Sequence, residues 1–489
     1  METLDHGLNR SSFLRHASRY LSATYLSRAL CAVRGFINAR WLGPELYGFW
    51  GGILLLLSFG YHLHGGVQEI MAREIPTYRS RGRVDLAHRT AQISFTFFFL
   101  LLLAASAVLW TVAARLPQGT PGMIRLGWVT AGVALPLEVL LFFEQTVTRA
   151  EERFERVSRG LLLAALISLA LTGWLVTSYG LAGLYLVVVI TPAVGLWYLR
   201  RRAEYRWRFV WSWDTVFPML KAGWPILAMT LVFEALWWVD RLLVWGWMGT
   251  AGFGFYGLGV MLVQLCFLFP EVVASIIQPQ LYFDYARGQR LSDVMDHLWF
   301  PLKTLALVFP LGLAMVDLLL PLLIHRWLPA YAPGMGAMRV LIWGSFFMGL
   351  AICTKPAIVA LGQQKRVLWF YGAAIAVNVV LGVALILVGW GLTGIAVGTA
   401  VAYCVCCTGL LVFTFRRLGE PLPSAIVRTV ALYGPWVLTS AAMVGFPFLA
   451  ARLNPSLGEL VLPVTRWTVA LSYGISVCLW MRRVGEIIP

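Results

Sequence analysis

The stretch Ser27–Trp50, SRALCAVRGFINARWLGPELYGFW, decides the fold of this chain. It begins as an apolar helix that carries Arg28 and Arg34, and it breaks at Leu42-Gly43-Pro44-Glu45. Glycine next to proline is one of the strongest local signals for the end of a helix. The apolar sequence then restarts through Tyr47-Gly48-Phe49-Trp50. This pattern predicts a helical hairpin with two cations in its first helix.

The same design returns 206 residues further along the chain. The run from Leu42 to Trp50 aligns there with Met248-Gly249-Thr250-Ala251-Gly252-Phe253-Gly254-Phe255-Tyr256, and both glycines of the first run match. At this offset Arg28 aligns with Glu234, and Arg34 aligns with Asp240. We therefore predict two related hairpins, one with bases and one with acids in its first helix.

Two further matches support a repeat. Tyr179–Leu184 resembles Trp390–Ile395 at an offset of 211 residues, and Arg81-Gly82 stands opposite Arg287-Gly288 at the first offset. Repeated spacing of this kind indicates tandem halves. Duplicated halves are a common plan for transporters, whose substrate site lies where the repeats meet.

The composition is that of a membrane protein. Hydrophobic residues make up 59% of the chain and charged residues only 13%, whereas soluble domains average ~25% charged residues. The stretches Thr90–Ala114, Gly160–Leu199 and Val367–Phe415 contain no charged residue. Because a spanning helix needs ~20 apolar residues, the first stretch predicts one helix and each of the others predicts two.

We predict an all-α polytopic membrane protein with fourteen transmembrane helices. They are expected at approximately 15–41, 46–72, 89–114, 123–148, 157–178, 181–200, 218–247, 253–280, 298–324, 335–361, 366–389, 392–415, 426–450 and 461–481. The predicted domains are an N-terminal lobe of six helices (1–205), a C-terminal lobe of six helices (206–418) and two appended helices (419–489).

The distribution of basic residues orients this topology. With both termini inside, most of the 39 lysines and arginines fall in the inner segments, as the positive-inside rule requires. We therefore expect both termini to be cytoplasmic. The net charge of +16 is explained as orientation signal and contact with anionic lipid heads, so nucleic acid is not an expected partner.

Several ionisable residues fall deep inside predicted spans, where each is costly. The bases are Arg28, Arg34, Arg241 and Lys355, and the acids are Glu138, Glu144, Glu234, Asp240, Glu271 and Asp317. One interpretation is a site for an anionic head group, because guanidinium groups suit phosphate oxygens. The other is buried ion pairs, for example Arg28 or Arg34 with Glu138.

The chain carries no Walker motif, nucleophile elbow or HExxH motif, so ATP-driven or hydrolytic chemistry has little support. The seven cysteines all lie in predicted spans, where they form no disulfide or zinc framework. We expect no cofactor, no resident metal and no catalytic residue.

The residues from Ala39 to Gly48, ARWLGPELYG, resemble the start of the bacterial oligosaccharide flippases, the Wzx-like polysaccharide transporters. The later run of Gly223-Trp224-Pro225, Asp240-Arg241 and Phe255-Tyr256-Gly257 resembles the opening of their second half. Relatives that share these motifs are the MurJ-like lipid II flippases and, more distantly, the MATE drug exporters. Together these proteins form the multidrug/oligosaccharidyl-lipid/polysaccharide (MOP) exporter superfamily.

The resemblance implies two pseudo-symmetric six-helix lobes around a central cavity, with two extra C-terminal helices in the fourteen-helix members. It implies alternating access without ATP hydrolysis. The usual substrate is an undecaprenyl-diphosphate-linked oligosaccharide, a precursor of O-antigen or exopolysaccharide, flipped across the bacterial inner membrane. Expected partners are this substrate, membrane lipids, a glycan polymerase and other polysaccharide-assembly proteins. The protein itself is expected to be a monomer.

Basic residues in the cavity of this family are thought to receive the diphosphate. The resemblance therefore implies that Arg28 and Arg34 bind the diphosphate, with Arg241 and Lys355 as further candidates. The deep acids are candidates for ion coupling, because alternating burial can load and release a proton or a cation. These acids are Glu138, Glu234, Asp240, Glu271 and Asp317.

Two other functions remain open from the sequence. A cation-coupled exporter of small amphipathic drugs, MATE-like, would need an acidic and aromatic cavity. A membrane enzyme such as a glycan polymerase, ligase or acyltransferase would carry a large periplasmic loop or a catalytic His/Asp motif, whereas the outer loops predicted here are short.

Overall fold

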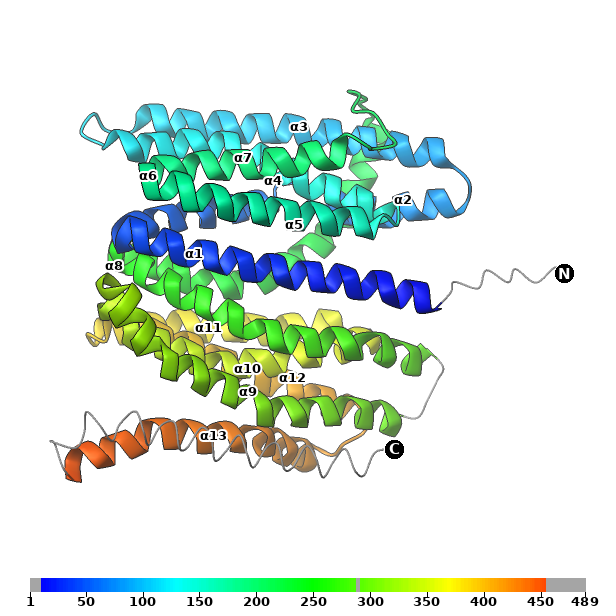
Figure 1. The fold of residues 1–489 in the computed structure, drawn as a ribbon. Helices are drawn as coiled ribbons and strands as arrows, with labels where there is room; N and C mark the ends of the chain where they lie inside the picture. Colours follow the sequence, from blue (N-terminus) through cyan, green and yellow to red (C-terminus); the bar gives the residue numbers. More distant parts are fainter. Residues whose placement is uncertain (1–9, 287–290, 454–489) are drawn as a thin grey trace. The chain divides into compact units, whose positions relative to one another are not determined.

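The computed structural model of the protein describes residues 10–286 and 291–453, which are helical throughout apart from short turns and one linker (Figure 1). The helices are α1 (Arg10–Gly60), α2 (Val67–Ser80), α3 (Val84–Arg115), α4 (Gly122–Ala150), α5 (Phe154–Leu171), a π-helical turn (Thr172–Val176), α6 (Thr177–Tyr179), α7 (Leu181–Arg200), α8 (Trp213–Ala286), α9 (Leu291–Trp327), a 3₁₀ turn (Pro329–Gly334), α10 (Met335–Ala360), α11 (Gln364–Leu387), α12 (Gly391–Arg417) and α13 (Leu422–Leu453).

Ten of the helical segments in the described ranges are long and apolar enough to cross a membrane. The prediction of an all-helical polytopic membrane protein is thus confirmed. Two of these segments, Ser22–Gly60 and Trp213–Gln278, are long enough for two crossings each. The last predicted helix, 461–481, lies outside the described residues.

Each of the two long segments turns at a glycine. Gly43 has φ 70° and ψ 172°, and Gly249 has φ 67° and ψ −168°. Backbone of this kind is essentially restricted to glycine. The hairpins predicted around Gly43 and Gly249 are therefore formed by the residues that the repeat singled out.

The second predicted helix, 46–72, is not continuous, and the prediction was wrong here. α1 ends at Gly60 and α2 begins at Val67, with a turn between them. Gly65 (φ 62°) and Gly66 (φ 92°) end the helical conformation, and the Gly66 amide donates to Nδ1 of His64 at 3.1 Å. A Cβ atom at Gly66 would lie 2.2 Å from the carbonyl carbon of Gly223, so two glycines let these backbones touch.

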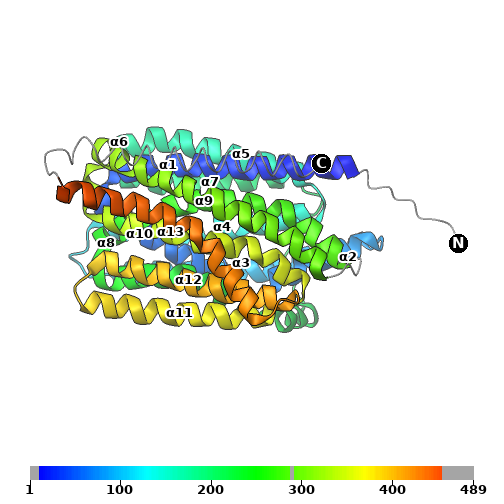
Figure 2. The ribbon, with the colours of Figure 1, turned by 90° about the horizontal axis from the view of Figure 1, so that it is seen from below.

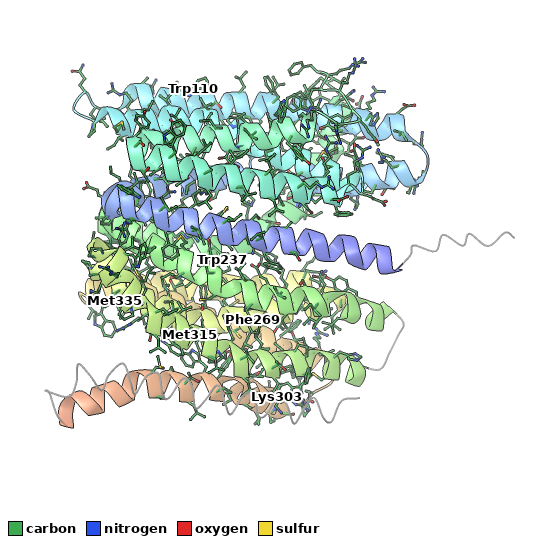
Figure 3. All side chains as sticks on the ribbon, viewed as in Figure 1. Trp110, Trp237, Phe269, Lys303, Met315 and Met335 are labelled. Carbon is green, nitrogen blue, oxygen red and sulfur yellow. The ribbon has the colours of Figure 1, made fainter. Side chains whose placement is uncertain are left out.

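The chain forms two compact units, Met1–Leu231 and Val232–Pro489. Within the first unit, α1 packs on α5, α3 on α4, and α4 on α7 (Figure 1). Trp110 of α3 lies at the α3–α4 contact (Figure 3). Its indole donates to the backbone oxygen of Val129 at 3.2 Å, and its ring fills the space beside Gly132.

In the second unit, α12 packs against both α10 and α11, which it accompanies along most of their length (Figure 2). α13 packs on α9 and α12. Its Trp436 donates to the Trp343 carbonyl at 3.0 Å, and its Tyr433 hydroxyl lies 2.9 Å from that of Thr408. α13 is thus fixed to this unit through its aromatic side chains.

The linker between α7 and α8 is tied down by one buried carboxylate. Glu144 of α4 is only 1% exposed. Its Oε1 accepts hydrogen bonds from the Tyr205 hydroxyl and the Trp207 indole, and it lies 3.5 Å from an Arg200 nitrogen. Trp207 also stacks on Phe95 of α3 with ring centroids 4.6 Å apart. This intramembrane acid therefore has a structural role.

Candidate functional site

Arg34 stands in a polar cluster inside the spans of the first unit. Its Nη1 donates to the Ser168 hydroxyl of α5 at 2.6 Å. Its charge also interacts with Glu138 of α4, whose carboxylate accepts a hydrogen bond from the Tyr61 hydroxyl at 2.8 Å. We call these four residues the Arg34 cluster. It brings together a predicted substrate-binding base and a predicted coupling acid.

Arg28 lies on the same helix but is exposed. Six positions separate it from Arg34, which corresponds to about 240° of helix rotation and about 9 Å of rise. The two arginines therefore do not share a face of α1.

A second polar cluster lies in the second unit around Asp240 of α8, which is 2% exposed. One carboxylate oxygen accepts from the Tyr256 hydroxyl at 2.6 Å and from the Thr399 hydroxyl of α12 at 3.4 Å. The other accepts from the Arg241 backbone amide at 2.8 Å. The carboxylate thus accepts its hydrogen bonds from neutral donors of two helices, and the charge of Arg241 also acts on it.

Asn378 lies on α11 where this helix packs against α12 near Thr399. The backbones of α11 and α12 meet where Gly398, the neighbour of Thr399, abuts Gly382 and the Asn378 carbonyl. A Cβ atom at Gly382 would lie 3.0 Å from Leu243, one turn beyond Asp240, and 4.0 Å from the Asn378 side-chain oxygen. Asn378 is fully buried, and neither amide atom has a hydrogen-bond partner among the described residues. We call Asp240, Tyr256, Thr399 and Asn378 the Asp240 cluster.

The other predicted site residues are scattered. Asp317 is buried and forms an ion pair with Arg339 at 2.9 Å. Lys355 is exposed on α10, with its ammonium 5.2 Å from the centre of the Phe233 ring. Arg241, Glu234 and Glu271 are half-buried.

The sequence reasoning missed the neutral members of both clusters. Ser168, Asn378 and Thr399 all fall in stretches without any charge. A polar side chain inside such a stretch is a usable signal, since buried polar groups require partners.

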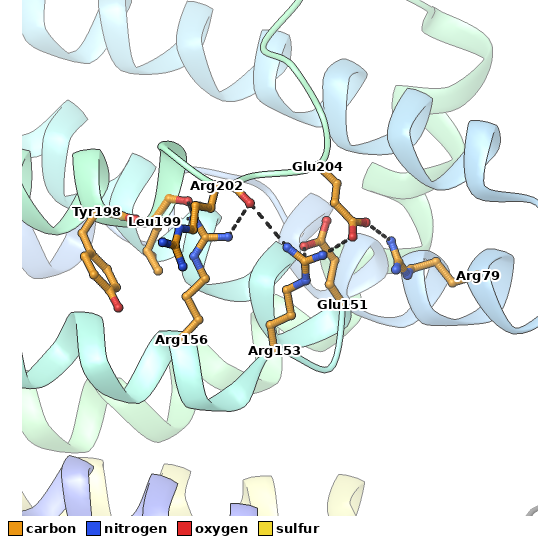
Figure 4. A network of polar contacts seen from close by, with 8 residues as sticks. All are labelled: Arg79, Glu151, Arg153, Arg156, Tyr198, Leu199, Arg202 and Glu204. Carbon is orange, nitrogen blue, oxygen red and sulfur yellow. Dashed lines mark hydrogen bonds and ion pairs between the residues drawn. The ribbon is translucent and has the colours of Figure 1, made fainter.

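A network of charges lies where the first unit carries its basic loops, at 81–83, 151–153 and 201–212. We call this region the basic end (Figure 4). One carboxylate oxygen of Glu204 forms an ion pair with Arg79 at 2.9 Å, and the other forms one with Arg153. The hydrogen bond from Arg79 and the charge of Arg153 hold the pKa of Glu204 below its ordinary value. Burial instead raises the pKa of Glu151.

His88, Glu151 and Glu204 are the one group of three potential ligands in the described residues whose donor atoms lie within 4.8 Å of one another. Both oxygens of Glu204 already face a guanidinium. Two cations beside the group disfavour a third, so the arrangement serves as an ion-pair network.

Comparisons with known proteins identify a family and a relative of this chain. The sequence profile described as "Polysaccharide biosynthesis protein" matches residues 37–315. A curated relative, the putative O-antigen transporter of Shigella flexneri, is 22% identical over 350 residues, which cover 68% of this chain and 80% of that protein.

Solved structures share the fold. The lipid II flippase MurJ in an inward closed conformation superposes with a TM-score of 0.69 at 15% identity, covering 95% of this chain and 99% of that one. An inward-facing multidrug resistance MATE family transporter of the MOP superfamily superposes with a TM-score of 0.66 at 14% identity, covering 82% and 96%. With the profile matching more than half of its length, the chain belongs to the Polysaccharide biosynthesis protein family, and it has the fold of MurJ and of the MATE family transporter.

Proposed function

We propose that this protein is a flippase that moves an undecaprenyl-diphosphate-linked oligosaccharide across the bacterial inner membrane by alternating access. Both termini are then cytoplasmic, and the glycan is delivered for polymerisation on the other side. The family match and the O-antigen transporter relative support a lipid-linked glycan as the cargo.

The observation that carries the proposal is the setting of Arg34. A guanidinium inside a spanning segment is costly unless it is paired or used. Here the Arg34 guanidinium donates to a neutral hydroxyl, that of Ser168, and the neighbouring Glu138 already accepts a hydrogen bond from Tyr61. A diphosphate offers more charge than one carboxylate and suits the planar guanidinium fork. The diphosphate can therefore replace the Ser168 hydroxyl as the hydrogen-bond partner of Arg34 at little cost.

Arg28 adds a second step to this route. It lies about 9 Å nearer the N-terminal end of α1 than Arg34, and its side chain is exposed. With the N-terminus cytoplasmic, a diphosphate that enters from the inner leaflet meets Arg28 first and Arg34 next. Arg241 and Lys355 are secondary contacts in this scheme.

Asp240 is the coupling carboxylate that the geometry supports best. Its hydrogen-bond partners are hydroxyls and a backbone amide, and the buried Asn378 amide belongs to the same cluster. Carboxylate, hydroxyl and amide oxygens are the donors that a hard cation prefers, and the same carboxylate can carry a proton. Glu138 is the second candidate. Asp317 is better explained by its ion pair with Arg339.

The test is complementation of a host that lacks its own glycan flippase and carries the matching glycan pathway. The expected result is restored surface polysaccharide and loss of the lipid-linked precursor from the inner leaflet. If the protein leaves the precursor in place but confers resistance to cationic drugs, the proposal is wrong and a MATE-like exporter is supported.

A further inference from the structure

The basic end of the first unit contains a small pocket between the start of α5 and the end of α7. Its volume is about 130 Å³, and it is lined by Glu155, Arg156, Arg159, Tyr198, Arg201 and Arg202. A single water needs only ~10–15 Å³ of such space, so the pocket has room for a group of several atoms. Four arginines and one glutamate give the lining a strongly positive charge.

One of these arginines builds the frame of the pocket. Arg156 donates to the carbonyl oxygens of Leu199 and Arg202, which lie at the C-terminal end of α7 (Figure 4). Arg153 adds a bond to the same Arg202 oxygen at 3.4 Å. These bonds use carbonyls that a helix end leaves unsatisfied. They fix α5 to α7 and hold the pocket open.

Two other arginines are available to a ligand. Arg201 lies over the rings of Trp197 and Tyr198, with its guanidinium carbon 5.0 Å from each centre. Arg159 pairs with Glu155 at 2.7 Å, and their side chains are 67% and 45% exposed. An exposed pair of this kind contributes little stability, so a phosphate can displace the glutamate.

The surroundings of the pocket match a lipid rather than a dissolved ion. The candidate spans begin at Phe154 and end at Arg200 on this side, which places the pocket at a membrane boundary. Trp197 is 59% exposed beside it, and Leu166, two helical turns beyond Arg159, is 54% exposed. An exposed tryptophan at a span end is typical of the head-group region, and the apolar surface above it suits an acyl chain.

We propose that this arginine pocket binds the phosphodiester head group of an anionic phospholipid, in the leaflet that faces the basic end. Arg159 and Arg201 contact the phosphate oxygens, Arg156 shapes the wall, and the acyl chains lie along α5 and α7. Basic pockets between spanning helices are known to take such head groups. The inference does not depend on the glycan cargo.

The test uses the full-length protein in nanodiscs that contain either phosphatidylglycerol with phosphatidylethanolamine or phosphatidylethanolamine alone. The double variant Arg159→Gln/Arg201→Gln is compared with Arg81→Gln/Arg83→Gln. The control removes the same charge from the exposed α2–α3 turn at the same end. The readouts are the number of phosphatidylglycerol molecules retained in native mass spectrometry and the melting temperature.

We expect phosphatidylglycerol to raise the melting temperature of the wild type and of the control. In the pocket variant most of this rise should disappear, and its affinity for the lipid should fall on the order of tenfold, because two charge-assisted contacts are lost. Equal losses in pocket and control variants would show non-specific attraction and overturn the proposal. If soluble glycerol phosphate raised the melting temperature by the same amount, the pocket would be a site for a free phosphate, and the proposal of a lipid ligand would be overturned.

Discussion

Gly43 and Gly249 adopt nearly the same backbone conformation, although 206 residues separate them. Each stands between two apolar segments of one long helical element. The second match of the repeat behaves alike, since Gly180 and Gly391 also have positive φ values, 56° and 54°. Both halves of the sequence thus turn the chain at corresponding glycines.

The first prediction follows from these dihedral angles. Gly43→Ala and Gly249→Ala should each destabilise the protein by about 1–3 kcal/mol, because alanine is strained in this conformation. Neither glycine has other atoms within 4 Å of an added Cβ, so steric contact does not contribute. Gly246→Ala is the control: it has equally open space but no positive φ. Thermal unfolding in detergent measures the difference, and equal melting temperatures for all three would contradict the account.

The second prediction concerns the linker anchor. Glu144→Gln should lower stability by about 1–3 kcal/mol, since Arg200 loses its charged partner and the hydrogen bonds from the linker lose their charge assistance. Glu155→Gln is the matched control, an exposed acid that also pairs with an arginine. Its effect should stay below ~1 kcal/mol. Proteolysis of the 201–212 linker gives an independent readout. A linker that stays protected in Glu144→Gln would speak against the anchoring role.

The third prediction is a pH dependence at Glu204. Its folded-state pKa is lowered, first by the hydrogen bond from Arg79. The stability that it contributes is therefore present above the ordinary glutamate pKa of 4.5 and is lost as the pH falls through the lower folded value. At pH 7 the melting temperature of the wild type should be higher than that of Glu204→Gln, and this difference should disappear in strong acid. A difference in melting temperature that grows on acidification would contradict a lowered pKa of Glu204 in the folded state.

The fourth prediction concerns coupling. Asp240→Asn should remove the dependence of transport on an ion gradient, since the amide neither ionises nor offers a charged ligand. Asp317→Asn is the control within the same unit, and it should affect stability more than coupling because its carboxylate pairs with Arg339. Transport is measured in proteoliposomes with imposed proton or sodium gradients. Unchanged gradient dependence in Asp240→Asn would exclude this carboxylate.

Much of the fold could be predicted from the sequence, because spanning helices are encoded locally. Length, hydropathy and the glycine breaks at Gly43 and Gly249 are each visible within a few turns of chain. The interruption between Gly60 and Val67 was missed, because its reason is a contact with Gly223 far away in sequence.

The candidate site could be predicted only in part. Depth in a span identified Arg34, Glu138 and Asp240 as unusual, and an ion pair of Arg34 with Glu138 was one of the alternatives, but the hydroxyl groups that bind these side chains were not foreseen. Arg339, the partner of Asp317, was not among the deep charges that the sequence singled out. Which charge pairs and which remains available depends on the packing of helices, and a single sequence does not show that packing.

The export rate of the Arg34→Ala variant is the sharpest test of whether Arg34 receives the diphosphate. In the complemented host, we expect surface glycan to fall at least about tenfold while the protein level stays normal. Arg34→Lys should restore export only in part, because lysine lacks the planar fork. The control Arg40→Ala, on the same helix, should export normally. Export at the wild-type rate by Arg34→Ala would contradict the account.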